Sequence, residues 1–209
     1  MGFYSRYLLP TIVSCGCSLP PITELRQWLV PRATGTVLEL GFGSGLNLPL
    51  YQQNKVSRIY GLEPDAAMLK KAQRRVAQSP VPVSVLQERA ETLSLADQSI
   101  DTVLVTFTLC TVPDVATALR AARRVLKPQG QLLFCEHGRS PDAEIFNRQM
   151  RIEPLWKKIF GGCHLTRDIP TLIKQAGFAI NDLDANYMLN RGPNIGGYIY
   201  RGSASVLNA

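Results

Sequence analysis

The stretch VLELGFGSGLNLPLY (residues 37–51) joins an apolar, strand-like run to three glycines at alternate positions. Gly41, Gly43 and Gly45 therefore follow the end of a predicted strand. Glycine adopts backbone angles that are closed to other residues and lets the backbone approach a ligand closely. The stretch predicts either a tight strand-to-helix turn or a ligand-binding loop.

Strand-like and helix-like segments alternate from residue 34 onwards. The predicted strands are 36–40, 57–63, 81–87, 99–110, 130–138, 179–188 and 195–203. The predicted helices are 64–78, with Pro64 at its first position, and 114–127, with Asp114 as its N-cap. This alternation predicts an α/β fold: a Rossmann-like, doubly wound, mostly parallel seven-stranded sheet with helices on both faces.

Two segments depart from this alternation. Residues 1–33 are apolar but interrupted by prolines, and they predict a helical lid or a segment that contacts a membrane. Residues 34–209 form the main domain, in which about 141–167 is a helical insertion after the fifth strand. The prolines of the N-terminal segment leave no run of the roughly 20 unbroken apolar residues that a membrane span needs. The segment also lacks the compact apolar core and the cleavage signature of a secretory signal.

The charge distribution and the cysteine spacing argue against a nucleic-acid-binding protein and against a zinc protein. The formal net charge is +7, but the basic runs 70–75 and 120–127 lie in helical patterns with apolar residues opposite, which favours solvated helix surfaces over nucleic-acid binding. The five cysteines are scattered, with no C-x-x-C pair and no His/Cys spacing suited to zinc. We therefore predict no metal site and expect reduced thiols in a cytoplasmic protein.

Acidic residues flank the glycine loop on both sides. Glu39 lies within the end of the first strand, and Glu63 ends the second strand, 22 residues after Gly41. That is the distance at which an acidic residue meets ribose hydroxyls in nucleotide-binding sheets. A dinucleotide fingerprint would require glycine at Leu46, and a carboxylate is a poor neighbour for pyrophosphate. The pattern instead suits S-adenosylmethionine, which carries an ammonium group, a sulfonium, a ribose and an adenine.

The motifs from residue 37 to 138 resemble those of class I S-adenosylmethionine-dependent methyltransferases, in the order of that family. They are VLELGFGSG, GLEPDAAML, RAETLSL, SIDTVLVTFTLCTVPD and VLKPQGQLLFCEH. Within this class the chain resembles the methyltransferase-11-like group. FTLCTV, RVLKPQGQLLFCEH and FGGCHLTRD resemble, more narrowly, the thiol S-methyltransferases of the endoplasmic reticulum and their bacterial relatives.

This resemblance implies a set of cofactor contacts. The glycines would line the methionine and ribose portions, Glu39 would help to hold the amino group, and Glu63 would bind the ribose hydroxyls. Ala90 and Glu91 would flank the adenine. The full expected set is Glu39, Gly41, Phe42, Gly43, Ser44, Gly45, Asn47, Glu63, Pro64, Ala90, Glu91, Thr106, Phe107 and Leu109. Arg89 departs from the aspartate that many relatives carry.

Methyl transfer from a sulfonium depends mainly on positioning, and a base is needed only if the acceptor arrives protonated. His137, at the end of the fifth strand, is our expected base; a structural hydrogen-bonding role is the alternative. Nothing near Cys110 or Cys163 in the sequence predicts a lowered thiol pKa, so we expect neither to carry a methyl group.

The resemblance implies a small, apolar methyl acceptor, most specifically a thiol. Oxygen, nitrogen or carbon acceptors on a quinone or phospholipid remain open, as does a non-catalytic, membrane-associated protein that binds S-adenosylmethionine. The fourth strand ends in TFTLC and lacks the Asn/Asp-Pro-Pro-aromatic motif of nucleic-acid amino methyltransferases, so we expect no nucleic-acid partner. Peripheral membrane contact through the N-terminus is the remaining alternative to a lid.

Overall fold

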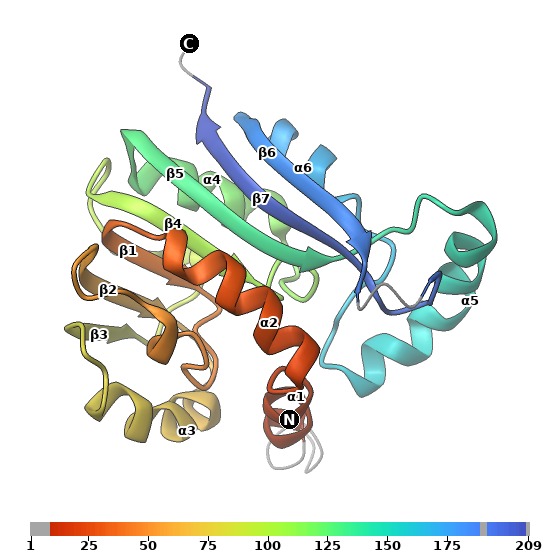
Figure 1. The fold of residues 1–209 in the computed structure, drawn as a ribbon, viewed down its shortest axis with the longest axis horizontal. Helices are drawn as coiled ribbons and strands as arrows, with labels where there is room; N and C mark the ends of the chain where they lie inside the picture. Colours follow the sequence, from red (N-terminus) through yellow and green to blue (C-terminus); the bar gives the residue numbers. More distant parts are fainter. Residues whose placement is uncertain (1–8, 189–191, 208–209) are drawn as a thin grey trace.

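A computed structural model describes residues 9–188 and 192–207, which form a seven-stranded sheet flanked by helices (Figure 1). The strands are β1 (Gly35–Leu40), β2 (Val56–Leu62), β3 (Val83–Leu86), β4 (Ile100–Thr106), β5 (Leu126–His137), β6 (Phe178–Tyr187) and β7 (Tyr198–Val206). The helices are α1 (Leu9–Gly16), α2 (Pro20–Leu29), α3 (Ala66–Ala77), α4 (Val115–Val125), α5 (Ala143–Ile159) and α6 (Ile169–Gln175), with short 3-10 turns at Val30–Arg32, Leu48–Leu50 and Ala90–Thr92.

The strand order is β3-β2-β1-β4-β5-β7-β6, and the first five strands are parallel. Only β7 runs antiparallel to its neighbours β5 and β6. The order reverses between β1 and β4, so this is the point at which a doubly wound sheet opens a crevice at the carboxyl ends of its strands. The predicted fold class is confirmed.

Each face of the sheet buries its own apolar layer. Leu38, Val103 and Val105 pack with α4 and α6 on one face, while the alternate residues Val37 and Leu104 pack with α2 and α3 on the other. This alternation follows from the two-residue period of a strand. The central strands are apolar on both sides for the same reason.

Aspartates set the start of four helices. Asp65, Asp114, Asp142 and Asp168 each accept hydrogen bonds from backbone amides in the first turn of the helix that follows. Asp114 was the predicted cap. The expectation that Pro64 opens a helix is wrong, because the cap is Asp65 and the helix begins at Ala66. Helix α6 was not predicted.

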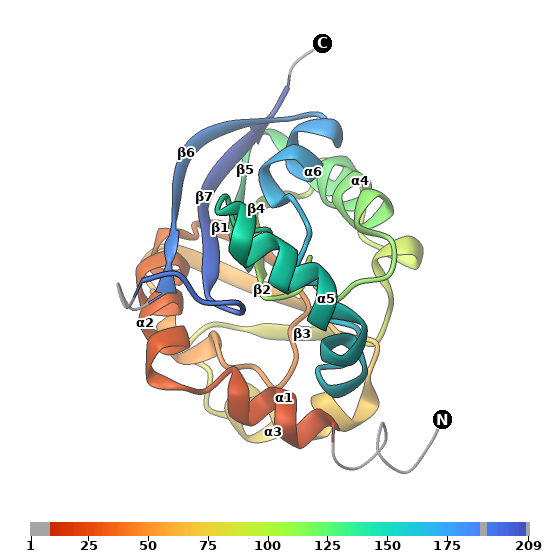
Figure 2. The same cartoon turned by 90° about the vertical axis from the view of Figure 1, so that its right-hand side faces the viewer.

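The additions to the sheet lie around the carboxyl ends of its parallel strands. In Figure 2, α2 lies at the left, α1 at the bottom, and α5, in the predicted insertion, at the centre and right. Among the described residues, no helix combines the length and apolar character that crossing a membrane would require.

Candidate active site

The glycine loop after β1 has the backbone that its sequence predicts. Gly41, Gly43 and Gly45 all have positive φ, at +73°, +56° and +73°. A Cβ on Gly41 would lie 2.0 Å from Thr108 Oγ1, so the backbone here passes too close to the next strand end for any side chain. The loop leaves space beside it that side chains would otherwise occupy.

That space is a cavity of about 430 Å³ at the carboxyl ends of β1, β2 and β4. Its volume is in the range of small-molecule sites. The predicted residues that line it are Gly41, Phe42, Gly43, Ser44, Glu63, Pro64, Ala90, Glu91, Thr106, Phe107 and Leu109. The structure therefore brings together most of the expected cofactor set. Glu39, Gly45, Asn47 and His137 are not on the cavity wall.

Glu63 is fixed at the end of β2 by backbone donors. Its Oε2 accepts a hydrogen bond from Gly43 N at 2.9 Å, and its Oε1 accepts one from Asp65 N at 3.0 Å. Burial raises the pKa of this carboxyl, and the two amide donors partly offset the effect. Each oxygen retains a lone pair, because a carboxylate can accept about four hydrogen bonds. Glu63 can therefore accept further hydrogen bonds from hydroxyl groups in the cavity.

An unexpected cation, Arg26 of α2, also lines the cavity. Its side chain is buried, and Nη1 donates to Asn47 Oδ1 at 2.7 Å and to Thr106 Oγ1 at 2.8 Å. The guanidinium also lies over the Phe107 ring, 5.5 Å from its centroid. Arg26 Nε is buried and has no hydrogen-bond partner among the described residues.

Glu39 takes a different place from the one expected. It is 1% exposed, and its two carboxylate oxygens accept hydrogen bonds from Asn47 Nδ2 at 2.9 Å and Tyr51 Oη at 2.8 Å. Burial raises its pKa to about 7, although both hydrogen bonds and Arg26 oppose the shift. Glu39 therefore positions Asn47, which in turn holds Arg26. Direct contact of Glu39 with a ligand amino group is not the arrangement in this structure.

The loop after β4 is held from behind by Glu136. This buried carboxylate accepts hydrogen bonds from Thr108 N at 2.7 Å and Cys110 N at 3.2 Å. Phe107 has a φ of +52°, which is unfavourable for a residue with a side chain and is tolerated only where the surroundings impose it. The strand predicted over 99–110 therefore ends at Thr106, and the next three residues, Phe107, Thr108 and Leu109, form part of the cavity wall.

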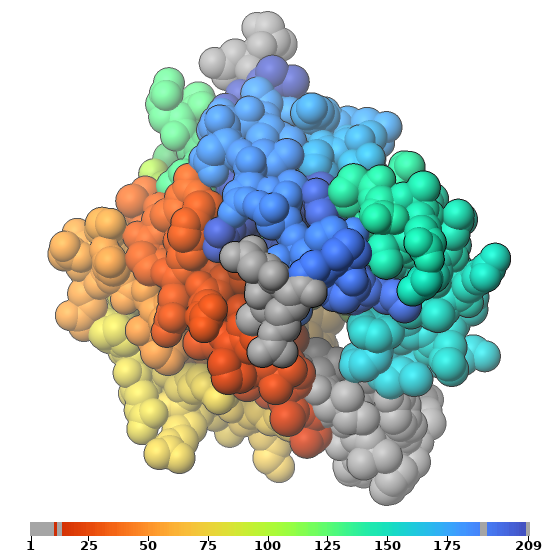
Figure 3. Space-filling model, turned by 45° about the vertical axis from the view of Figure 1, so that its right-hand side comes forward, coloured from red at the N-terminus to blue at the C-terminus, as the bar shows by residue number. Residues whose placement is uncertain are grey.

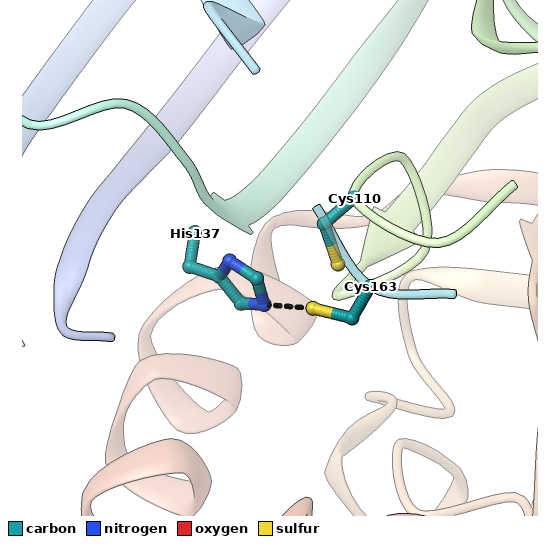
Figure 4. Close-up of side chains that lie close together, drawn as sticks. All are labelled: Cys110, His137 and Cys163. Atoms are coloured by element: carbon teal, nitrogen blue, oxygen red, sulfur yellow. Dashed lines mark hydrogen bonds between the residues drawn. The ribbon is translucent and has the colours of Figure 1, made fainter. Parts of the chain in front are cut away.

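His137 lies among sulfur atoms rather than on the cavity wall. Its Nε2 is 2.9 Å from Cys163 Sγ, and Cys110 Sγ lies beside both (Figure 4). Its Nδ1 is buried without a hydrogen-bond partner in the described part of the chain. The ring also lies 6.3 Å from that of Phe107, which does line the cavity. His137 is thus one layer behind the wall.

The two thiols of this group titrate differently. The hydrogen bond with Cys163 and the nearby His137 hold the pKa of Cys110 well below its usual value, against the effect of burial. The same hydrogen bond, together with burial, raises the pKa of Cys163. Burial lowers the pKa of His137, but the charge of Cys110 outweighs it and the pKa is raised. The expectation that nothing lowers the pKa of Cys110 is wrong.

Two segments outside the sheet complete the cavity. Ser14, Cys17 and Arg26 come from the N-terminal helices and the turn between them, and Phe160 and Gly161 follow α5. Figure 3 shows this face hollowed between the red N-terminal segment and the blue-green segment that contains α5. The sequence predicted a lid from residues 1–33 but did not single out Ser14, Cys17 or Arg26, because these contacts depend on how distant segments meet.

The comparisons with known proteins agree with this geometry. The sequence profile of the family described as "Methyltransferase domain" matches residues 38–134. Thiol S-methyltransferase TMT1B of Rattus norvegicus is 33% identical over 148 residues, which are 69% of this chain and 60% of that protein. Its Homo sapiens counterpart is 35% identical over 153 residues, 70% of this chain and 62% of that protein. The chain thus spans less than two thirds of these relatives.

The fold has close structural counterparts. A crystal structure described as a SAM-dependent methyltransferase from Methanosarcina mazei superimposes with a TM-score of 0.65. It covers 91% of this chain and 99% of its own, at 20% sequence identity. At that identity the likeness concerns the fold alone.

Proposed function

The chain belongs to the class I S-adenosylmethionine-dependent methyltransferases, and we propose that it transfers the methyl group of this cofactor to a small, apolar thiol. The observation that supports the proposal most is the cavity itself. It lies at the carboxyl ends of β1, β2 and β4, with a glycine-rich loop, a carboxylate and a buried cation on its wall.

These groups fit the parts of the cofactor. We propose that Glu63 accepts hydrogen bonds from the ribose hydroxyls and that the residues around Ala90 flank the adenine. Arg26, whose Nε is an unused buried donor, would hold the carboxylate of the methionyl group. The backbone at Gly41 and Gly43 would lie against the methionyl and ribose portions. The cofactor, when bound, supplies a methyl group already activated by a sulfonium.

Positioning is the main contribution of the chain in this proposal. A rigid wall that holds the acceptor sulfur about 3–3.5 Å from the methyl carbon can supply roughly 7–11 kcal/mol of the barrier. Phe107 and Leu109 belong to the loop that Glu136 fixes from behind, so this wall is well ordered for that task. His137 lies behind Phe107, within the group of sulfur atoms, and its role as a base stays a prediction.

The thiol as acceptor is supported by the two TMT1B relatives, which are thiol S-methyltransferases, and by the apolar additions around the cavity. Phe160 lines the cavity, and its ring stacks against Trp156 with centroids 4.1 Å apart. We propose that Ser14, Cys17 and the end of α5 form the acceptor side of the cavity, with the N-terminal helices as its lid and Arg26 of α2 on the cofactor side. Trp28 of α2 is not part of this side, because its ring packs against Arg32 and Arg201.

A matched acceptor panel tests the proposal. The full chain is incubated with S-adenosylmethionine and pairs of alkyl and aryl thiols and alcohols that differ only in the accepting atom. We expect methylated thiols and no methylated alcohols, with the activity lost in Glu63→Ala. Turnover of quinone, amine or phospholipid acceptors without turnover of thiols would contradict the thiol. Absence of heat on titration with S-adenosylhomocysteine would contradict the cofactor site as a whole.

The same preparation tests the N-terminal helices. If they cover the cavity, flotation with phosphatidylcholine vesicles leaves the protein in the unbound fraction while turnover persists. Flotation with the vesicles would favour the membrane contact over the lid.

A further inference from the structure

Three metal-ligating side chains from separate parts of the chain meet behind the cavity wall. Cys110 follows β4, His137 ends β5, and Cys163 follows α5. One ligand atom from each lies within 4.8 Å of the other two, and His137 Nε2 is 2.9 Å from Cys163 Sγ. Figure 4 shows the three side chains turned toward one another.

The group is closely associated with the cavity but shielded from solvent. Cys110 and Cys163 are 1% and 6% exposed. Cys110 stands between Leu109 and Thr111, which both line the cavity, and Gly161 lines it just before Cys163. The chain segments that carry both cysteines therefore border the space in which we place the acceptor, while the cysteines themselves lie behind the cavity wall.

The surrounding structure holds these donors in place. Glu136 accepts a hydrogen bond from Cys110 N, and the carbonyl of Cys110 accepts one from His164 N at 2.7 Å. Trp156 Nε1 donates to Cys163 Sγ at 3.3 Å. Groups that orient metal ligands in this way are a regular part of metal sites. The segment after Cys163 is tied to α5 in turn, because Glu153 accepts hydrogen bonds from backbone amides of that segment.

The chemistry of the donors favours zinc. Two thiolates and an imidazole are soft or borderline ligands, which suit Zn²⁺ and exclude the oxygen-preferring Mg²⁺ and Ca²⁺. Bond lengths of about 2.3 Å to sulfur and about 2.0–2.1 Å to nitrogen place tetrahedral ligand atoms about 3.5–3.8 Å apart. The present separations, 2.9 Å for one pair and at most 4.8 Å for the others, bracket that range. Small side-chain movements would close the site.

We propose that Cys110, His137 and Cys163 bind one Zn²⁺ ion. Three protein ligands leave a fourth tetrahedral position, as in zinc sites that take an exogenous ligand. If the acceptor is a thiol, which rests on the proposed function, its sulfur occupies that position as a thiolate and its proton passes to solvent. That sulfur then forms the new bond to the methyl carbon as the carbon–sulfonium bond breaks, and the electron pair stays on the departing sulfur.

Metal content tests the site without reference to activity. The full chain is loaded with Zn²⁺, desalted and analysed by elemental mass spectrometry, then loaded with Co²⁺ for absorption spectroscopy. We expect one metal per chain and a thiolate-to-cobalt charge-transfer band in the unmodified protein. Cys110→Ser and Cys163→Ser should bind metal more than about tenfold more weakly. Cys15→Ser is the matched control, because Cys15 is an exposed free cysteine outside the group, and it should retain the metal.

A second measurement needs no substitution and so does not depend on the folding of a variant. Zn²⁺ should protect Cys110 and Cys163 from alkylation by iodoacetamide, while Cys15 reacts at an unchanged rate. Equal alkylation with and without Zn²⁺, or a Cys110–Cys163 disulfide in the purified protein, would overturn the zinc site. Bound metal without methylation of any thiol would count against the proposed acceptor and leave the zinc site standing. Thiol methylation at full rate by metal-free protein would support the proposed acceptor and count against the zinc site.

Discussion

Replacing Arg26 with methionine tests how the cavity recognises the methionyl end of the cofactor. Methionine keeps much of the side-chain length and removes the charge and all donors. In our assignment the guanidinium binds the cofactor carboxylate, an interaction between charged hydrogen-bonding groups worth about 1.5–3 kcal/mol. The affinity for S-adenosylhomocysteine should then fall about 10- to 150-fold.

A ligand pair makes the test specific to the carboxylate. Isothermal titration calorimetry compares S-adenosylhomocysteine with 5′-methylthioadenosine, which has the same adenosine and sulfur but no amino-acid portion. Arg26→Met should weaken the first ligand and leave the second nearly unchanged. Equal losses for both ligands, or no loss for either, would refute the assignment.

Stability has to be measured in parallel, because Arg26 also bonds to protein groups. Its removal leaves Asn47 Oδ1 without that buried donor, at a cost of about 1–3 kcal/mol. Urea unfolding of the unmodified protein and of Arg26→Met measures this loss of unfolding free energy. Arg32→Met is the matched control, since Arg32 is half-buried, pairs with Asp182 at 2.7 Å and does not line the cavity. It should change stability slightly and ligand affinity not at all.

The other predictions concern the loop and its carboxylates. Glu63→Ala should weaken S-adenosylhomocysteine and 5′-methylthioadenosine alike, by about 10- to 150-fold, because both contain the ribose; calorimetry that shows a loss for only one would contradict this. Gly41→Ala should abolish measurable binding, since its Cβ would lie 2.0 Å from Thr108 Oγ1, whereas Gly16→Ala, with no atom within 4 Å, should bind normally. The pKa of Glu39 is raised to about 7, above its unfolded value near 4.3, so the stability this residue contributes is present at low pH and is lost as the pH rises through about 7. The unfolding free energy of the unmodified protein relative to Glu39→Gln should fall by about 2.5 kcal/mol from about pH 5 to about pH 8, and a difference independent of pH would contradict the shift.

Local patterns were sufficient to predict the fold. The alternation of strand and helix periods, the glycine loop and the Asp114 cap all act over a few residues, and the structure has them where the sequence indicated. The strand predicted over 99–110 was too long because its last four residues are as apolar as the strand. The amides of Thr108 and Cys110 donate hydrogen bonds to Glu136, and these bonds hold the four residues in a loop instead of a strand. Glu136 is far along the chain, so the local pattern does not reveal this.

The site was predictable only where its residues follow strand ends. Arg26 lies 80 residues from Thr106, its hydrogen-bond partner, and nothing in the spacing of the N-terminal segment singles it out. The group of Cys110, His137 and Cys163 was missed for the same reason, since a search for short metal-binding spacings cannot detect ligands from three separate elements. The burial of Glu39 between Asn47 and Tyr51, off the cavity wall, could not be read from its place at the end of a strand, and its contact with the cofactor stays a prediction.

Glu136 fixes the loop after β4, so the part of the cavity that binds the methyl donor is built differently from the part that we assign to the acceptor. The donor half is built from strand ends and is fixed by the core, so substitutions there would alter the chemistry itself. In our proposal the acceptor half comes from Ser14, Cys17 and the end of α5, which are appended to the sheet, whereas Arg26 of α2 belongs to the donor half. Variation of the appended residues other than Arg26 would then exchange one acceptor for another while the methyl donor continues to bind.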